Sequence, residues 1–393
     1  MLRHWMAAAL LLASASESTA EPRGQTSPRR VVAIGDIHGA IEPLRRILRE
    51  TRLMDSSGRW TGGDAMLVQT GDFLDRGAGV FEVVELLRSL QQQAPRDGGE
   101  VVVLMGNHEA INLIRDMSYV DAALLEPWAS RRADRLRRRH CDKALDLAQR
   151  RRALQDLDAP DPQRFRESCL AETPPGLLEY LESLEADADL GSWLRTLPAV
   201  VKVGDLLFVH GGLTEATAAL DPEEINAQAA REVAAFDRIR GWLISRSIVL
   251  PTAAPTEITN AALQVLDALE SGTKIFEAPA LEDLAEFRRV GEWILADPDG
   301  PLWFRGYARW DDQEGAPRVE AILRLSNANA IISGHTPQKT ANITERWDGR
   351  VYLIDTGMLG PYYGGQPSAL EVIGRQVTAI YPDLRHIFRG AVN

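Results

Sequence analysis

Short runs of apolar residues alternate along this chain with longer stretches that have helical spacing. The first apolar run, residues 31–34 (VVAI), leads directly into GDIHG at residues 35–39. A short run rich in β-branched residues predicts a buried strand, and the glycines allow the chain to turn at its end. Asp36 and His38 are two positions apart, so in extended chain both side chains point the same way. A carboxylate beside an imidazole at a strand end favours a divalent-metal site.

The same arrangement occurs four more times. Apolar runs precede GDFLDRG at residues 71–77, GNHE at 106–109, HGG at 210–212 and GHT at 334–336. Short motifs match by chance, but five strands that each end in glycine plus a metal-type side chain do not. We therefore expect these five strand ends to converge on one site.

The segments between the motifs predict an α/β fold. Residues 41–53 and 80–90 carry apolar side chains at helical spacing, so residues 31–109 form two βαβ units. Open α/β sheets build their sites at the carboxyl ends of such parallel strands. From residue 330 the chain changes to strands and turns (AIISG, VYLIDTG, ALEVI, VTAIY), which predict a second β-sheet.

Length and composition are those of a globular protein with a substantial core. The chain has 393 residues, of which 45% are hydrophobic and 25% charged. Because the motifs must converge, we expect one catalytic domain over residues 31–393, with helical insertions at about 115–198 and 214–300. The net charge of −12 argues against nonspecific binding of nucleic acid or of an anionic membrane.

In their order, the five motifs resemble those of the calcineurin-like metallophosphoesterases of the phosphoprotein phosphatase superfamily. GPLWFRG at residues 300–306 and DTGM…YYGG within residues 355–365 are similar to the bacterial-type branch called Shewanella-like protein phosphatases. The resemblance covers residues 31–389. It implies a two-sheet α/β sandwich, with the βαβ units on the N-terminal side, further strands on the C-terminal side and two helical insertions.

Matched residue by residue, the resemblance implies a dinuclear metal site. The ligands it implies are Asp36 and His38 for the first ion, Asn107, His210 and His335 for the second, and Asp72 as the bridge between them. A carboxylate can bridge two cations because it has two oxygens. Imidazole, carboxylate and amide ligands together suit divalent or trivalent manganese, iron or zinc more than calcium or magnesium.

The resemblance also implies catalytic roles. His108 would be the general acid that protonates the leaving oxygen, and Asp75 would orient its ring. His108 directly follows Asn107, so in extended chain the two side chains would point apart. A hydroxide bridging the metals would attack phosphorus in line, and no phosphoenzyme is expected because no nucleophile motif is present.

Two arginines and two tyrosines complete the implied site. Arg76 and Arg305 would bind phosphate oxygens, since a planar guanidinium suits bidentate contacts. An ion pair at the edge of the core is the alternative for Arg305. Tyr362 and Tyr363 resemble an aromatic pair near the site mouth, although packing between loop and sheet accounts for them equally well.

The expected function is hydrolysis of phosphomonoesters by a dinuclear-metal-dependent phosphatase. Its substrate would be a phosphorylated protein, modified on Tyr or on Ser/Thr, or a small phosphoester. One alternative is hydrolysis of dinucleoside polyphosphates or other small phosphoanhydrides. Another is an inactive metal-binding scaffold, against which the complete ligand set argues.

The N-terminus predicts export. Arg3, the apolar run at residues 5–13 and small residues at 18–20 are typical of a cleaved signal peptide over residues 1–20, followed by a linker at 21–30. We therefore expect an exported, periplasmic protein. The alternative is an irregular or amphipathic N-terminus in a cytoplasmic protein. No other stretch is long and apolar enough to cross a membrane, so stable membrane insertion is not expected.

Residues 131–152 contain nine Arg and one Lys against three Asp. Such a run fits either nucleic-acid binding or an exposed helix that faces acidic neighbours at residues 179–189. The second is favoured because no aromatic residue interleaves the arginines to stack on bases. The only cysteines, Cys141 and Cys169, would form a disulfide in an exported protein and stay free thiols in the cytoplasm.

Overall fold

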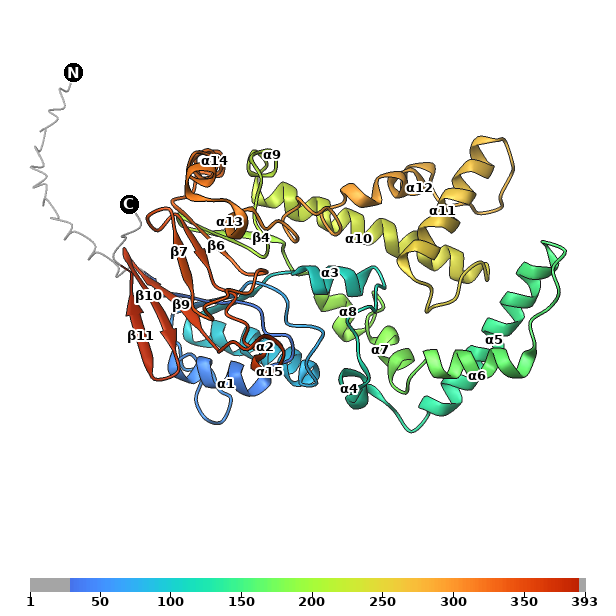
Figure 1. Cartoon of the computed structure of the whole chain (residues 1–393), viewed down its shortest axis with the longest axis horizontal. Helices are drawn as coiled ribbons and strands as arrows, with labels where there is room; N and C mark the ends of the chain where they lie inside the picture. Colours follow the sequence, from blue (N-terminus) through green and yellow to red (C-terminus); the bar gives the residue numbers. More distant parts are fainter. Residues whose placement is uncertain (1–28, 389–393) are drawn as a thin grey trace, which may run out of the picture.

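The computed structural model describes residues 29–388, so the predicted signal peptide and most of the predicted linker lie outside the described residues. Two mixed β-sheets lie face to face, and helices pack on their outer sides (Figure 1). This confirms the expected α/β sandwich. Within the described part of the chain, no helix combines the length and hydropathy that a membrane span requires.

The first sheet has six strands in the order β11-β10-β9-β1-β2-β3. In that order its strands are Leu384–Ile387, Gln376–Tyr381, Ala369–Ile373, Val31–Ile34, Met66–Gln69 and Glu100–Val103. Strands β1, β2 and β3 are parallel and in step, as the two βαβ units predict. Their carboxyl ends therefore lie side by side at one edge of the sheet.

The second sheet has five strands in the order β4-β5-β6-β8-β7. In that order its strands are Val200–Val203, Leu206–Val209, Ala330–Ser333, Val351–Leu353 and Thr344–Arg346. Strands β5, β6 and β8 are parallel, so this sheet also gathers several carboxyl ends at one edge.

The C-terminal strands were expected to form one sheet together, and this expectation is wrong in part. Strands β6 and β8 belong to the second sheet, whereas β9 and β10 return to the first. Strand β9 pairs antiparallel with β1, where Val31 faces Val372, and so extends the edge that β1 would otherwise expose. Unpaired backbone groups at such an edge favour this pairing.

Strands β1, β2, β5 and β6 are buried on both faces, which explains their continuous apolar runs. In β1, Val31 and Ala33 belong to the layer between the two sheets, whereas Val32 and Ile34 belong to the layer beneath the helices. Side chains alternate along a strand, so each strand contributes to both layers.

Helices cover the outer faces. The helices nearest the first sheet are α1 (Ile41–Glu50), α2 (Val80–Gln93), the 3₁₀ helix η1 (Ala94–Asp97) and α3 (Asn107–Leu113). Those that follow the second sheet's strands are α9 (Glu215–Ala218), α13 (Gly306–Arg309), α14 (Asp312–Leu325) and α15 (Gly360–Tyr363). Helices α1 and α2 begin at residues 41 and 80, where the apolar spacing predicts them.

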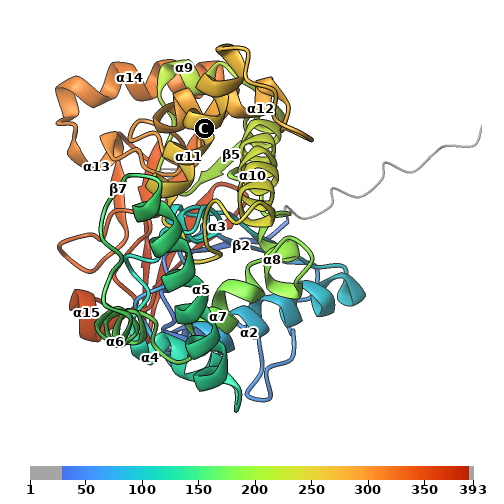
Figure 2. The same ribbon diagram turned by 90° about the vertical axis from the view of Figure 1, so that its right-hand side faces the viewer.

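Two helical segments extend away from the sheets (Figures 1 and 2). The first contains α4 (Ala122–Leu125), η2 (Glu126–Trp128), α5 (Ala133–Ala153), α6 (Pro162–Glu172), α7 (Leu177–Ser183) and α8 (Asp189–Leu194). The second contains α10 (Pro222–Ser245), α11 (Pro255–Glu270), α12 (Leu281–Glu286) and η3 (Phe287–Glu292).

Helix α5 carries the arginine-rich run and is largely exposed along its length. Its arginines do not pair with the acidic residues expected from sequence: Arg137 pairs within the helix with Asp134, and Arg151 pairs with Glu257 of α11. Cys141 of α5 and Cys169 of α6 are joined in a disulfide.

Candidate active site

The candidate metal ligands all lie directly after strands, and they come from both sheets. They are Asp36 and His38 after β1, Asp72 after β2, Asn107 after β3, His210 after β5 and His335 after β6. All are at least nine-tenths buried. The carboxyl ends of the two sheets therefore meet in one place, as the five motifs predict.

Tight turns aim these side chains at a common centre. His38 (φ 48°), Asp72 (57°), Asp75 (63°), Arg76 (68°) and His335 (67°) all adopt left-handed backbone conformations. Such conformations are uncommon for residues other than glycine and cluster at functional sites. The expectation of extended chain through His38 is therefore wrong, yet its Nε2 still lies 4.0 Å from Asp36 Oδ2.

Glu109 holds the turn that carries Asp72. Its buried carboxylate accepts hydrogen bonds from the backbone N–H groups of Asp72 (2.8 Å), Phe73 (3.0 Å), Leu74 (3.0 Å) and Gly106 (2.8 Å). Burial and the nearby charge of Asp72 raise the pKa of Glu109 to about 7. No role for Glu109 could be predicted from the sequence, because nothing local shows which backbone amides its carboxylate meets.

Two glycines are required for close approach in this region. A Cβ on Gly106 would lie 2.3 Å from Asp72 Oδ1, and a Cβ on Gly334 would lie 2.5 Å from Asp36 Oδ1. Both positions therefore need glycine to let the carboxylates reach the centre.

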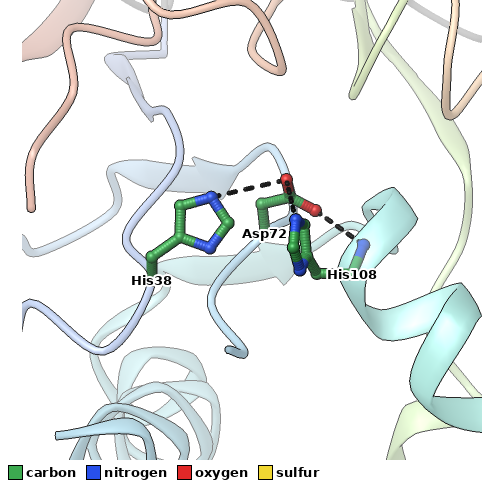
Figure 3. A group of neighbouring side chains, drawn as sticks. All are labelled: His38, Asp72 and His108. Carbon is green, nitrogen blue, oxygen red and sulfur yellow. Dashed lines mark hydrogen bonds and ion pairs between the residues drawn. The ribbon is translucent and has the colours of Figure 1, made fainter. Parts of the chain in front are cut away.

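The two carboxylate oxygens of Asp72 face different groups of ligands. Oδ1 lies 3.3 Å from His210 Nε2. Oδ2 lies 3.6 Å from His38 Nε2, and Figure 3 shows these two side chains together with His108. His210 Nε2 in turn lies 3.0 Å from Asn107 Oδ1 and 3.1 Å from His335 Nδ1. The arrangement thus has one cluster on each side of a single carboxylate.

A further buried carboxylate, that of Asp355 after β8, lies beside Asp36. Asp355 Oδ1 accepts the Gly357 N–H (3.0 Å), but among residues 29–388 no hydrogen-bond donor reaches its Oδ2. Burial, followed by the charges of Asp355 and Asp72, raises the pKa of Asp36. Burial likewise raises the pKa of Asp355 to about 6. Asp355 lies within the DTGM motif, but its position in the sequence did not predict a function for it.

Two imidazoles of the site, those of His38 and His335, are disposed to stay neutral. Burial lowers the pKa of His38 to about 3, and burial with the charges of His210 and Arg305 lowers that of His335 well below its usual value. His38 Nδ1 donates to the Leu74 carbonyl (2.9 Å), which leaves Nε2 with its lone pair toward Asp72. Neutral imidazoles and ionised carboxylates are the forms that bind cations.

His108 and Asp75 form a close pair. His108 Nδ1 donates to Asp75 Oδ2 at 2.6 Å, and both residues are fully buried. Burial would lower the pKa of His108, but the charge of Asp72 and the hydrogen bond to Asp75 raise it overall. Asn107 and His108 begin helix α3 rather than continue a strand, so the expectation drawn for extended chain does not apply. Their side chains nevertheless reach different partners, His210 and Asp75.

Two groups of side chains are close enough to hold a metal ion. One contains His38, Asp72 and His108 and the other contains Asp72, His210 and His335, with the ligand atoms of each group within 4.8 Å of one another. A second carboxylate, that of Asp36, also lies near His38, with its Oδ2 4.0 Å from His38 Nε2. On the first side, geometry alone therefore admits either Asp36 or His108 as the third ligand.

Arg76 lies at the mouth of the site among three tyrosine rings. Its guanidinium carbon is 5.4 Å from the ring centres of Tyr119 and Tyr363 and 5.5 Å from that of Tyr362. Its Nη1 contacts His38 Nε2 and the Tyr363 hydroxyl. The Tyr119 ring lies 4.8 Å from that of His108, so the aromatic mouth also covers the buried pair. No pattern in the sequence indicated a role for Tyr119, because it follows α3 in a segment without a motif.

Arg305 approaches the site from the second sheet. Its Nη1 donates to the His335 carbonyl (2.9 Å) and to Thr336 Oγ1 (3.1 Å), and its side chain is half-buried. Burial lowers its pKa, although the charges of Asp36 and Asp72 act in the opposite direction. No ion pair joins Arg305 to an acidic residue in the described part of the chain, so the ion-pair alternative finds no partner there.

Comparison with known proteins agrees with this geometry. The sequence matches the family model of calcineurin-like phosphoesterases over residues 29–339. It is 34% identical to Shewanella-like protein phosphatase 2 of Arabidopsis thaliana over 230 residues, which cover 55% of this chain and 52%, about half, of that relative. It is 23% identical over 356 residues to Shewanella-like protein phosphatase 1 of Plasmodium berghei, covering 89% of this chain and 74% of that protein.

A solved structure shows the same fold. It is that of the cold-active protein tyrosine phosphatase of a psychrophilic Shewanella species, which matches with a TM-score of 0.57 at 23% identity, covering 92% of this chain and 81% of that one.

Proposed function

Since the chain belongs to the calcineurin-like phosphoesterase family and is a metal-dependent phosphoesterase, we propose that it uses two metal ions to hydrolyse phosphomonoesters of proteins. The observation that carries this proposal is the position of Asp72. Its Oδ1 faces His210 and its Oδ2 faces His38, so one carboxylate adjoins two clusters of ligand atoms. A shared carboxylate is what two-metal hydrolysis requires.

The donor set fits two cations. Three buried carboxylates, those of Asp36, Asp72 and Asp355, lie together with neutral imidazoles, and Asp355 Oδ2 lacks a donor among residues 29–388. Cations would offset this concentration of buried negative charge. When bound, they supply the Lewis acidity that activates water and neutralises phosphate oxygens. In our proposal Asp36 and His38 hold one with Asp72, and Asn107, His210 and His335 hold the other with Asp72.

His108 is assigned to proton transfer rather than to a metal. Its Nδ1–H is committed to Asp75, which fixes the tautomer and stabilises the charged ring. A raised pKa keeps a proton on the ring, which suits an acid and disfavours a metal ligand. Nε2 then points toward Asp72 and carries the proton that the leaving oxygen receives.

The two arginines would bind the phosphate. In this proposal Arg76 leaves His38 Nε2 when a cation takes that nitrogen, and its guanidinium then faces the entering phosphate. Arg305 is fixed by the His335 carbonyl on the opposite side. The phosphate would thus be held from both sheets.

We further propose phosphotyrosine as the preferred phosphorylated side chain. Tyr119 and Tyr362 are 44% and 62% exposed, so their rings are available to contact an aromatic leaving group as it enters. The Shewanella protein of similar fold is a protein tyrosine phosphatase, and the relatives from Arabidopsis thaliana and Plasmodium berghei are named protein phosphatases. Both points support a protein substrate that presents an aromatic phosphoester.

The test is phosphate release by purified protein loaded separately with manganese, iron or zinc. We expect turnover of p-nitrophenyl phosphate and of a phosphotyrosine peptide, with a lower rate on the same peptide bearing phosphoserine. Turnover of dinucleoside polyphosphates alone would contradict the phosphomonoesterase assignment. Metal binding without hydrolysis of any phosphoester would support the scaffold alternative instead.

We also propose that the protein is exported to the periplasm. The Cys141–Cys169 disulfide supports this, because disulfides persist in oxidising compartments and are rare in the cytosol. Intact-mass measurement on protein from the native cell should give a chain that begins near Glu21. A full-length species with free thiols would contradict export.

A further inference from the structure

The Asp75–His108 pair is itself held by a buried amide. Asn112 Nδ2 donates to Asp75 Oδ1 (3.0 Å), to Asp75 Oδ2 (2.9 Å) and to the backbone carbonyl of His108 (2.8 Å). Asn112 lies one helical turn after His108 in α3, so both side chains project from the same face. The amide has two N–H groups, and these contacts use both of them.

Tyr180 determines which way this amide points. Its hydroxyl donates to Asn112 Oδ1 at 2.9 Å. The carboxylate of Asp75 and the carbonyl of His108 can only accept, so the NH₂ group must face them and Oδ1 must face the tyrosine. Burial, with the charges of Asp75 and Glu109, raises the pKa of Tyr180 well above its usual value, so its hydroxyl stays protonated and donates.

Tyr180 belongs to α7, in the first helical segment that extends from the sheets. Its side chain is fully buried, and its ring packs against Trp128 of η2 at a centre-to-centre distance of 5.2 Å. Arg115 adds a second link, since its Nη1 donates to the carbonyl of Leu181 next in α7 (2.8 Å). Helix α7 is therefore fixed against α3 at the level of the His108–Asp75 pair.

We propose that Tyr180, acting through Asn112, is a positioning residue for proton transfer by His108. The inference rests on the proposed function, because it assumes that His108 donates a proton to the leaving oxygen. Without the tyrosine hydroxyl, Asn112 Oδ1 has no donor and the amide can rotate. Asp75 then loses the N–H groups that hold its carboxylate against His108 Nδ1.

The expected effect depends on the leaving group. Partners that orient a functional group through a second residue typically contribute ~10–100-fold, and we expect Tyr180→Phe to lose about 10-fold on a phosphoserine peptide. With p-nitrophenyl phosphate the loss should be less than about threefold, because a good leaving group needs little protonation. A purely structural defect would lower both rates by the same factor.

The matched control is Tyr381→Phe. Tyr381 of β10 is also buried, and its hydroxyl also makes one hydrogen bond, accepting the Ile343 N–H at 2.8 Å. Any loss of activity in Tyr381→Phe, relative to wild type, should be the same factor for the phosphoserine peptide and for p-nitrophenyl phosphate. Asn112→Ala removes the same link from the other side and should reproduce the pattern of Tyr180→Phe with a larger loss, which keeps the test valid should one variant fold poorly.

A second readout does not depend on turnover. In metal-free protein labelled with ¹⁵N-histidine, the Nδ1–H of His108 should give a low-field proton signal, assigned by its loss in His108→Gln. Tyr180→Phe should shift this signal or speed its exchange with water, whereas Tyr381→Phe should leave it unchanged.

Equal losses on both substrates with an unaltered signal would overturn the role of Tyr180 while leaving the phosphatase assignment intact. Absence of phosphatase activity in the wild type would instead refute the proposed function.

Discussion

The two nitrogens of the His108 ring lie in different environments and therefore have different roles. On one side Nδ1 is bound to Asp75 at 2.6 Å, and on the other Nε2 faces Asp72 Oδ2 at 3.9 Å. A nitrogen fixed by a carboxylate and a second nitrogen directed at the reaction centre are typical of a general acid. The pair is buried, and the Tyr119 ring packs against the ring of His108.

His108→Ala should therefore slow the reaction without emptying the metal site. We expect a loss of ~10²–10⁴-fold for a serine phosphoester, the usual contribution of general acid catalysis, and a much smaller loss for p-nitrophenyl phosphate. The measurement is the logarithm of the rate against the leaving-group pKa, together with the metal content. Parallel lines for wild type and variant, or a halved metal content, would show that His108 has another role.

At the mouth of the site, Tyr362→Ala should change the preference between substrates more than the rate of the chemical step. Removing an exposed ring that flanks Arg76 takes away contact with an aromatic leaving group, which is worth about 0.5–1.5 kcal/mol. We expect kcat/KM for a phosphotyrosine peptide to fall roughly 2–10-fold, with the phosphoserine peptide nearly unaffected. Phe81, which is 42% exposed and packs against Trp128, offers a control as Phe81→Ala. The same loss on both peptides would exclude a role of Tyr362 in specificity.

Among the helices, Glu185 connects elements that lie far apart in the sequence. It follows α7 and accepts from Arg240 of α10 at 2.9 Å and 2.8 Å, and it pairs with Arg115 after α3 at 3.1 Å. Both arginines are nearly fully buried. Burial would raise the pKa of Glu185, but the hydrogen bond to Arg240 and the charges of Arg240 and Arg115 lower it below its usual value of 4.5.

Glu185→Gln should destabilise the protein in a pH-dependent way. At pH 7 we expect the free energy of unfolding to fall by about 1–3 kcal/mol, less than for a fully buried pair because the carboxylate is partly exposed. Because the folded-state pKa of Glu185 is lowered, its contribution to the free energy of unfolding is present at pH values above its unfolded-state pKa. It is lost as pH falls below about 4.5 and the folded-state carboxyl takes up its proton.

Urea unfolding at pH 7 and at pH 4 measures this difference. Glu182→Gln is the matched control, because Glu182 is an exposed residue of α7 and the substitution removes the same charge. An equal effect at the two pH values, or equal effects of the two substitutions, would contradict the proposed link between α7 and α10.

For the molecule as a whole, the site joins two sheets that otherwise meet through an apolar layer. The proposed ligands follow β1, β2 and β3 on one side and β5 and β6 on the other. Without cations, the carboxylates of Asp36, Asp72 and Asp355 repel one another across this junction. Metal binding should therefore stabilise the entire sandwich and not the site alone.

Chelation should lower the melting temperature. A ligand present at 100 times its Kd stabilises the folded state by about 2.7 kcal/mol, which corresponds to a shift of about 3 °C for each bound ion in a chain of this size. Calorimetry before and after chelation, and after the metal is restored, measures the shift. Asp72→Asn, which loses the shared carboxylate, should show little response to chelator. A wild-type melting temperature that chelation leaves unchanged would mean that the sheets do not depend on bound metal.

The sequence predicts what is local and misses what depends on tertiary contacts. The strand ends and the proposed ligands could be predicted, because each motif carries its own apolar run, glycine and polar side chain. Glu109, Asn112 and Tyr180 act through partners that are remote in sequence, such as the amides of residues 72–74, so no local pattern shows their roles. The return of β9 to the first sheet was missed for the same reason, since its apolar pattern fits either sheet.

The most direct test of the central claim is a crystal structure of the manganese-loaded protein with anomalous diffraction data. We expect two anomalous peaks about 3.5–4 Å apart, on opposite sides of the Asp72 carboxylate. Asp36 and His38 should bind one, Asn107, His210 and His335 the other, and His108 Nε2 should bind neither. A single peak, or a peak held by His108 in place of Asp36, would contradict it.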